Sequence, residues 1–183
     1  MNYCVLDLEM NQPSGAIIQI GAVCYDTRRG VTSSFTVDVN PHEQLTEFIT
    51  ELTGITQADV DKADPLPLAY TALVEWAEKA GCQANMATWG TDYWTLKTQV
   101  APQYWVWRRF LNVKEVATLL RAHDSGKARG GLSASLDYFG LKFLGTPHTA
   151  VADAYNTARL LAVVGLEHKL WVTSRRLNGL DNI

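Results

Sequence analysis

Three β-type segments open this chain, and segments that alternate between helical and β-type patterns follow them. Residues 3–9, 16–25 and 33–39 are rich in Val, Ile, Tyr, Phe and Cys, and turn residues separate them. The second break has the composition of a hairpin turn, so we expect these strands to form an antiparallel meander. Further strands are predicted at 84–89 and 106–111. This order predicts an α/β fold with a mixed five-stranded sheet, in which three antiparallel strands lead into parallel ones.

Helical patterns occupy most of the remaining chain. Helices are predicted at 42–51, 57–63, 67–80, 92–100, 113–123, 132–139, 149–164 and 166–177. The sequence has no internal repeat, no low-complexity stretch and no long linker. Residues 1–183 are therefore expected to form a single domain with helices flanking the sheet.

The composition excludes several classes of protein. With 47% hydrophobic and 19% charged residues, the chain has the balance of a globular protein rather than that of a disordered, fibrous or coiled-coil one. Its three cysteines are irregularly spaced, which indicates reduced thiols rather than a disulfide framework or a zinc site. It has no signal-peptide pattern and no apolar run of about 18 residues. We therefore expect a soluble, cytoplasmic protein that does not associate with a membrane.

Charge is distributed unevenly along the chain, although the net formal charge is only −3. Residues 1–64 contain 10 acidic and 3 basic side chains, whereas residues 97–129 contain 7 basic and 2 acidic ones. The ordinary interpretation of the second stretch is a solvated basic face. The alternative is a surface that follows phosphates beside an acidic metal site.

Two acidic residues interrupt the first apolar strand. Asp7 and Glu9 are two positions apart, so in a strand both point to one face while Leu6 and Leu8 point to the other. Neighbouring carboxylates repel each other and raise each other's pKa unless a cation lies between them. Oxygen ligands of this kind suit Mg²⁺ or Mn²⁺. The alternative is an edge strand with two acids that simply face solvent.

Two further candidates lie later in the chain. His148 stands in a loop after Pro147, and Asp153 lies in the first turns of the next helix, so both can reach one point. A histidine beside metal-binding carboxylates is placed to take a proton from an attacking water, although a loop histidine is more often structural. Asp92 directly follows an apolar strand and opens a helix, where the helix dipole alone would favour an acid. Together these residues have the composition that two-metal hydrolysis of a phosphodiester requires.

Short motifs connect these candidates in a characteristic order. They are VLDLE at 5–9, IQIGAV at 18–23, LTGITQ at 52–57, TWG at 88–90, GLS at 131–133, GL at 140–141 and HTAVADAYNTAR at 148–159. The set resembles the DEDD superfamily of exonucleases in its histidine branch, and within that branch the Eri-type and sporulation-inhibitor-type enzymes. The resemblance covers about residues 3–165. In its terms the first motif is VLDLE at 5–9, the second follows TWG at 88–90, and the third begins at His148.

The resemblance implies a ribonuclease H-like fold, 3′-to-5′ exonuclease activity and two bound divalent ions, Mg²⁺ or Mn²⁺. Carried over onto this chain, the metal ligands would be Asp7, Glu9, Asp92 and Asp153, and His148 would be the general base. Eri-type members place the second-motif aspartate three residues after the glycine, where this chain has Tyr93. Asp92 is the only carboxylate nearby and is therefore assigned to this motif.

The resemblance also indicates where substrate would bind. By this resemblance, Met10 and Asn11 would lie near the terminal nucleotide. Independently of it, Trp89 and Trp94 belong to an aromatic cluster beside the basic segment and are candidates to stack on bases, with core packing as the alternative role for tryptophan. The expected substrate is single-stranded nucleic acid with a free 3′ end, and the Eri-like segments favour RNA. A 3′-to-5′ DNA exonuclease of the proofreading or repair type is the alternative activity. A catalytically silent nucleic-acid-binding module and an accessory domain of a polymerase complex are the alternatives from other classes.

Overall fold

A mixed five-stranded sheet forms the centre of the molecule. The computed structural model describes residues 1–125 and 130–177, except for the side chains of residues 123–125 and 166–177. The strands are β1 (Asn2–Met10), β2 (Ile17–Asp26), β3 (Gly30–Asp38), β4 (Asn85–Thr88) and β5 (Arg109–Asn112). They lie in the order β3-β2-β1-β4-β5, with β1, β2 and β3 antiparallel and with β4 parallel to both β1 and β5. The predicted sheet is therefore confirmed.

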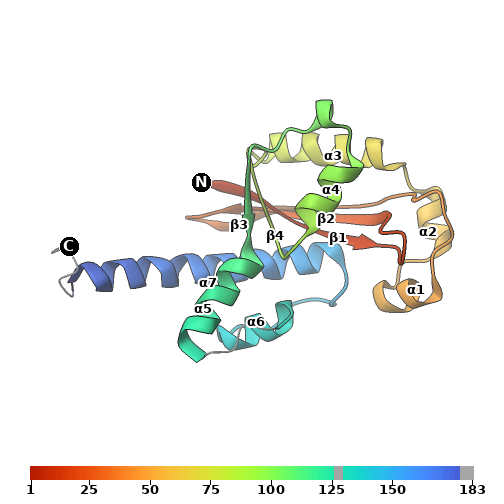
Figure 1. Cartoon of the computed structure of the whole chain (residues 1–183). Coiled ribbons are helices and arrows are strands. Elements are labelled where there is room, and N and C mark those ends of the chain that lie inside the picture. The colour runs from red at the N-terminus through yellow and green to blue at the C-terminus, as the bar shows by residue number, and fades with distance from the viewer. Residues whose placement is uncertain (126–129, 178–183) are drawn as a thin grey trace.

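Helices cover both faces of the sheet (Figure 1). They are α1 (Glu47–Thr53), α2 (Gln57–Lys62), α3 (Leu66–Lys79), α4 (Asp92–Gln99), the 3-10 turn η1 (Pro102–Tyr104), α5 (Val113–Ser125), α6 (Leu132–Tyr138) and α7 (Ala150–Leu177). Helix α3 lies on one face, whereas α7 lies on the other with α5 and α6 beside it. Each face has its own hydrophobic cluster, one toward α3 and one toward α7.

The side chains of the central strand β1 alternate between these two clusters. Leu6 and Leu8 belong to the cluster on the α3 side, and Val5 belongs to the cluster on the α7 side. Burial of each leucine stabilises the fold by roughly 2 kcal/mol, which holds the strand in this orientation. Asp7 and Glu9 share the face of Val5 and so point toward α7, as the strand period of two predicts.

Capping side chains set the ends of the first two helices. The helix predicted from residue 42 begins only at Glu47, because the side chain of Thr46 caps its first turn. Residues 42–46 form a loop instead. Thr56 caps α2 in a reciprocal capping box with Asp59, so this helix begins at Gln57 as predicted.

Two other boundaries differ from the sequence-based predictions. The helices expected at 149–164 and 166–177 are one continuous α7, because Gly165 does not interrupt the helix. The strand expected at 106–111 begins only at Arg109, after an irregular segment. Among the described residues, no helix combines the length and the apolar character that a membrane span requires.

Candidate active site

Acidic side chains from three elements meet on the α7 side of β1. β1 contributes Asp7 and Glu9, the start of α4 contributes Asp92 and the first turn of α7 contributes Asp153. β4 is hydrogen bonded in parallel to β1, with Thr88 opposite Leu6, so the chain leaving β4 enters α4 beside Asp7. The topology of the sheet therefore brings the second motif to the first.

A close contact between β2 and α7 brings the third motif to the same place. A Cβ atom on Gly21 would lie 2.1 Å from the carbonyl carbon of Ala150 and 2.1 Å from the backbone nitrogen of Val151. No side chain larger than hydrogen fits between these backbones. The glycine of the IQIGAV motif therefore allows α7 to start directly on the sheet, with Asp153 over β1.

The first amide of α7 is capped from the sheet. The position of Thr149 predicts that its own side chain caps the helix, but its hydroxyl donates to the carbonyl of Thr146 instead. The N–H of Ala150 donates to Oε1 of Gln19 on β2, over 3.1 Å. The amide nitrogen of Gln19 in turn donates to Asp38, over 2.8 Å, which holds the glutamine in place. The IQIGAV motif contains both Gln19 and Gly21, but the sequence alone predicts neither the capping by Gln19 nor the close contact at Gly21.

His148 lies at the open side of the carboxylate group. Its backbone is left-handed (φ 61°), and its N–H donates to Oδ2 of Asp153 over 3.0 Å. Ligand atoms of Glu9, His148 and Asp153 all lie within 4.8 Å of one another. The histidine is exposed, whereas Glu9 is only 8% exposed. The imidazole therefore faces solvent while the acids lie behind it.

The carboxylates raise each other's pKa. Burial, followed by the nearby Asp153 and Asp92, raises the pKa of Glu9 to about 7. Burial and Asp153 also raise the pKa of Asp92 to about 7, against the opposing charge of Lys114. Asp7 keeps some solvent access, yet loss of hydration and its acidic neighbours hold its pKa well above the usual value. A bound cation would relieve this repulsion, so the donor set fits hard divalent ions.

A cavity of about 540 Å³ opens onto this group. Asp7, Glu9, His148 and Asp153 line it together with Leu8, Trp89, Leu132, Ser133, Phe143 and Pro147. None of the described residues that line it is a lysine or an arginine. The walls of the cavity are therefore largely apolar, and the part lined by Asp7, Glu9 and Asp153 is acidic. The sequence alone did not predict that Phe143 and Ser133 line this cavity, although Ser133 belongs to the GLS motif at 131–133.

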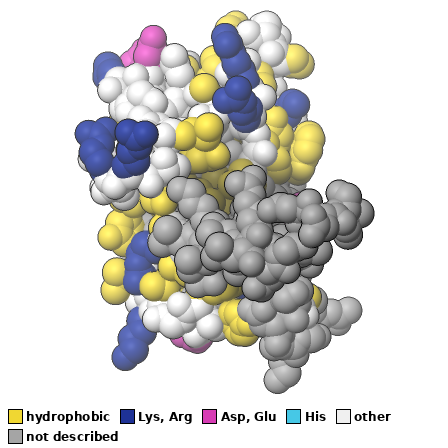
Figure 2. Space-filling model, turned by 90° about the vertical axis from the view of Figure 1, so that its left-hand side faces the viewer, with side chains coloured by type: hydrophobic (Ala, Val, Ile, Leu, Met, Phe, Trp, Pro, Cys, Tyr) yellow, Lys and Arg dark blue, Asp and Glu magenta, His cyan; other side chains and the backbone are white. Residues whose placement is uncertain are grey.

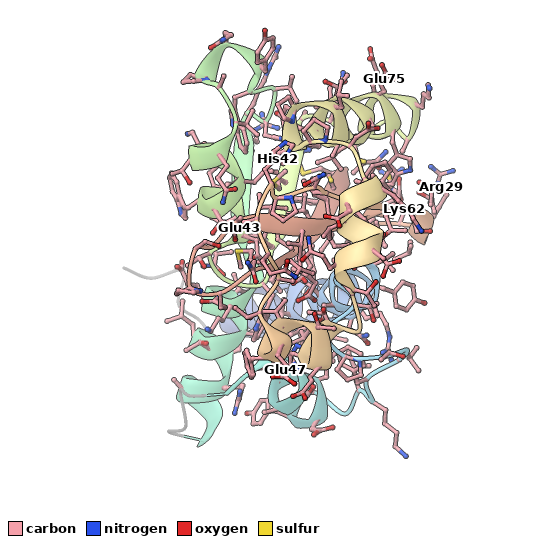
Figure 3. The ribbon with its side chains drawn as sticks, turned by 90° about the vertical axis from the view of Figure 1, so that its right-hand side faces the viewer. Arg29, His42, Glu43, Glu47, Lys62 and Glu75 are labelled. Atoms are coloured by element: carbon pink, nitrogen blue, oxygen red, sulfur yellow. The ribbon has the colours of Figure 1, made fainter. Side chains whose placement is uncertain are left out.

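The candidate substrate-binding residues do not all reach this cavity. Trp89 lines it, whereas Met10 packs into the cluster on the α3 side. Asn11 is 3% exposed and donates to Oε1 of Glu43 over 2.6 Å, while its own Oδ1 accepts from the N–H of Thr46. Figure 3 shows Glu43 in the loop that precedes α1. The side chain of Asn11 thus joins two loops and does not line the cavity.

Asp92, rather than its neighbour Tyr93, lies near the other carboxylates. Tyr93 is 7% exposed, and its ring stacks on Phe110 with centroids 4.1 Å apart. The tyrosine belongs to the cluster on the α3 side. Trp94, the other stacking candidate, is 54% exposed on α4 and lies outside the cavity lining. The structure therefore brings Asp92, and not Tyr93, to the other carboxylates.

A ribonuclease H-like sheet that carries a group of carboxylates and a histidine is typical of metal-dependent nucleases. A family model described as Exonuclease (RNase_T) matches residues 4–161, so the chain belongs to this exonuclease family. The family predicted from the sequence motifs is thereby confirmed.

Individual relatives agree with this family. The chain is 30% identical over 194 residues to mouse (Mus musculus) ERI1 exoribonuclease 2, covering 90% of this chain and 28% of that protein. It is 26% identical over 185 residues to rat (Rattus norvegicus) 3′-5′ exoribonuclease 1, covering 86% and 51%. The chain thus spans between about a quarter and a half of these relatives. Its fold is similar to the nuclease domain of 3′hExo, a DEDDh family member bound to rAMP, with a TM-score of 0.75, 22% identity, and coverage of 91% and 92%.

Proposed function

We propose that this chain is a divalent-metal-dependent exonuclease that removes nucleoside 5′-monophosphates from the 3′ end of single-stranded RNA. The observation that carries the proposal is the group of Asp7, Glu9, Asp92 and Asp153 beside the exposed His148, at the wall of an open cavity. The names of the relatives, which are 3′-5′ exoribonucleases and ERI1 exoribonucleases, support both the direction and the RNA substrate. These relatives are much longer than the matched region, so we propose the activity for the matched region alone.

The four carboxylates would hold two divalent ions, Mg²⁺ or Mn²⁺. Such ions supply Lewis-acid activation of water and stabilise negative charge on the leaving oxygen. The raised pKa values of Glu9 and Asp92 support this assignment, because the acids repel one another without a cation. No cationic side chain among the described residues lines the cavity, so the protein itself supplies little positive charge to the phosphate there.

His148 is the general base in this proposal. Its imidazole takes a proton from a water, and the water oxygen forms a bond to the phosphorus of the terminal phosphodiester. The bond from phosphorus to the 3′ oxygen of the preceding nucleotide breaks, its electron pair stays on that oxygen, and the oxygen takes a proton from solvent. The products are a nucleoside 5′-monophosphate and a chain one nucleotide shorter. Asp153 positions the base by accepting a hydrogen bond from the backbone N–H of His148.

The wall at Trp89 would support the terminal base. Its indole lines the cavity from the end of β4, and aromatic stacking of this kind contributes about 1–3 kcal/mol per base.

We also propose that residues 1–183 form one exonuclease domain. The three buried free thiols, Cys4, Cys24 and Cys82, support a cytoplasmic location, where thiols stay reduced.

The proposal is tested with matched single-stranded RNA and DNA of one sequence, labelled at the 5′ end and incubated with the protein and Mn²⁺. We expect a ladder shortening from the 3′ end on RNA, no ladder in EDTA and no ladder with Asp7→Asn. The matched control Glu51→Gln removes an exposed acid from α1 and should leave the ladder unchanged. Equal ladders on both substrates would overturn the RNA preference. A shift in gel mobility without degradation would favour the silent binding module.

A further inference from the structure

A second cavity lies at the opposite end of the parallel strands. Its volume is about 510 Å³, and Gln83, Ala84, Trp105, Val106, Trp107 and Arg108 line it. Both lining segments precede the parallel strands β4 and β5, whereas the acidic group follows the end of β4. Since β4 has four residues, about 10 Å of strand separates the two ends. The two cavities share no lining residue.

We propose that this second cavity, here called the Trp105 cavity, binds an upstream nucleotide of the single-stranded RNA whose 3′ end enters the active site. The inference rests on the proposed function for the identity of the strand. It adds a second binding site, separated from the active site by about the length of β4. This site would increase the affinity for RNA without taking part in hydrolysis.

A rigid aromatic wall is the first observation that supports the Trp105 cavity. The Trp105 ring stacks on Tyr70 at 6.1 Å and 11°, and it meets Tyr93 edge-on at 5.3 Å and 87°. Trp107 beside it is 4% exposed. Because these rings are already held in place, a base that stacks on the wall loses little side-chain entropy of the protein. Preformed aromatic platforms of this kind bind bases of any sequence.

Positive charge beside the wall is the second observation. Arg108 lines the cavity, and Arg109 follows it at the exposed start of β5. The backbone N–H groups of both arginines donate to the carbonyl of Ala84 over 3.2 Å, which fixes the segment. The ammonium group of Lys97 lies 5.9 Å from the Trp105 ring centroid. Among the described residues that line the cavity none is acidic, so the cavity fits a ligand that is both planar and anionic.

The wider surface has the same character. Figure 2 views the left-hand side of Figure 1, on which α3 ends, and Lys and Arg side chains stand there among hydrophobic ones with few acidic ones. Tyr104 and Val106, on either side of Trp105, are 63% and 37% exposed. Aromatic side chains next to arginines bind nucleic acid through stacking and phosphate contacts together.

The aromatic wall and the positive charge together select the class of ligand. An acidic peptide would satisfy the arginines but would not stack on the rings. We therefore assign the cavity to a nucleotide.

The test measures binding in EDTA, so that no hydrolysis occurs. The probe is a fluorescein-labelled single-stranded RNA of about 12 nucleotides, read by fluorescence anisotropy. We expect Arg108→Glu to weaken binding by at least about fivefold through the lost phosphate contact. The control Lys62→Glu makes the same charge change in the exposed last turn of α2, on the side of the molecule shown in Figure 3, and should leave the affinity within about twofold. A labelled oligoglutamate peptide of equal length is expected not to bind.

Photocrosslinking locates the strand without any substitution. The same RNA is synthesised with 4-thiouridine at successive positions upstream of the 3′ end, and crosslinked peptides are identified by mass spectrometry. We expect an upstream position to crosslink to the segment that contains Trp105 and Trp107. Three results would overturn the inference: crosslinks confined to the active-site cavity lined by Trp89, equal weakening of binding by Arg108→Glu and Lys62→Glu, or tight binding of the peptide. If Arg108-dependent RNA binding is found but RNA is not hydrolysed in Mn²⁺, the proposed function fails and the second site stands.

Discussion

The backbone of Ala150 lies against Gly21, so close that a Cβ atom on the glycine would stand 2.1 Å from the alanine carbonyl carbon. This contact sets the position of the start of α7 over β2. Asp153 lies one turn further along α7, and His148 lies just before the helix. The distance between the first and third motifs therefore depends on a residue that takes no part in chemistry.

The substitution Gly21→Ala is expected to move α7 away from the sheet. We expect a loss of about 3 kcal/mol in the free energy of unfolding, because backbone atoms cannot yield as a flexible side chain can. The hydrolysis rate should fall together with stability. Urea denaturation and a kinetic assay measure the two effects.

Gly165→Ala is the matched control for this substitution. Gly165 lies within the same helix, and no atom of the described part of the chain lies within 4 Å of the Cβ that it would gain. We expect this variant to be stabilised by up to about 1 kcal/mol, since alanine is the better helix former. Equal stability of Gly21→Ala and the wild type would show that the contact does not set the position of α7.

Stability without metal should fall as pH rises. The pKa values of Glu9 and Asp92 are about 7 in the folded chain, above the ordinary values of 4.5 and 3.8. The folded state thus binds more protons than the unfolded state, and the resulting stability is lost as pH rises through about 7. In EDTA we expect a decrease of about 2–4 kcal/mol between pH 5 and 8, measured by urea denaturation. Added Mn²⁺ should reverse the decrease, whereas a rise with pH in EDTA would contradict the account.

Asp92→Asn separates stability from activity. Because the substitution removes one charge from the repelling group, the variant should be more stable than the wild type in EDTA at alkaline pH. Its hydrolysis rate should be at least about 100-fold lower, as expected when a metal ligand is lost. Tyr93→Phe is the control, because the ring packing against Phe110 stays intact. Activity retained by Asp92→Asn would exclude this residue as the ligand of the second motif.

His148→Ala tests the general base. We expect a decrease in kcat of about 10²–10⁴-fold, with a free energy of unfolding within about 0.5 kcal/mol of the wild type, because the side chain is exposed. His42 is a matched control, since it is also an exposed loop histidine with a left-handed backbone (φ 56°). His42→Ala should retain full activity. Parallel losses in both variants would indicate a general effect of loop histidines rather than base catalysis.

Asn11→Ala tests whether this residue is structural. Loss of its hydrogen bonds to Glu43 and to the backbone of Gln44 and Thr46 should lower the free energy of unfolding by about 2 kcal/mol. KM for RNA should stay within about twofold of the wild-type value, since the side chain does not line the cavity. A large rise in KM without a loss of stability would assign Asn11 to substrate binding.

Local periodicity explains why the centre of the fold could be predicted. The strand period of two puts Asp7 and Glu9 on one face, and the hydrophobic patterns place the five strands and most of the helices. The loop before α7 likewise puts His148 and Asp153 within reach of one another, and the structure shows their hydrogen bond. These relations depend on residues close together in sequence.

Contacts between distant segments could not be predicted in the same way. The glutamine that caps α7 lies 131 positions from Ala150, and nothing local to Gln19 or Gly21 indicates a helix against them. The position of Asn11 directly after the first motif predicts a residue near the substrate. Its hydrogen-bond partners Glu43 and Thr46 lie more than 30 positions away in sequence, so their contact with Asn11 could not be predicted. The cavity walls at Ser133 and Phe143 come from α6, which packs on α5 and α7, and from the loop that follows it.

Binding of Mn²⁺ tests the central claim that carboxylates from β1, α4 and α7 form one divalent-metal site. Titration calorimetry on the full chain, with Mn²⁺ in the syringe, gives the stoichiometry directly. We expect two ions per chain, loss of binding in Asp7→Asn, and unchanged binding in the control Glu51→Gln. A wild-type isotherm indistinguishable from that of Asp7→Asn would contradict it.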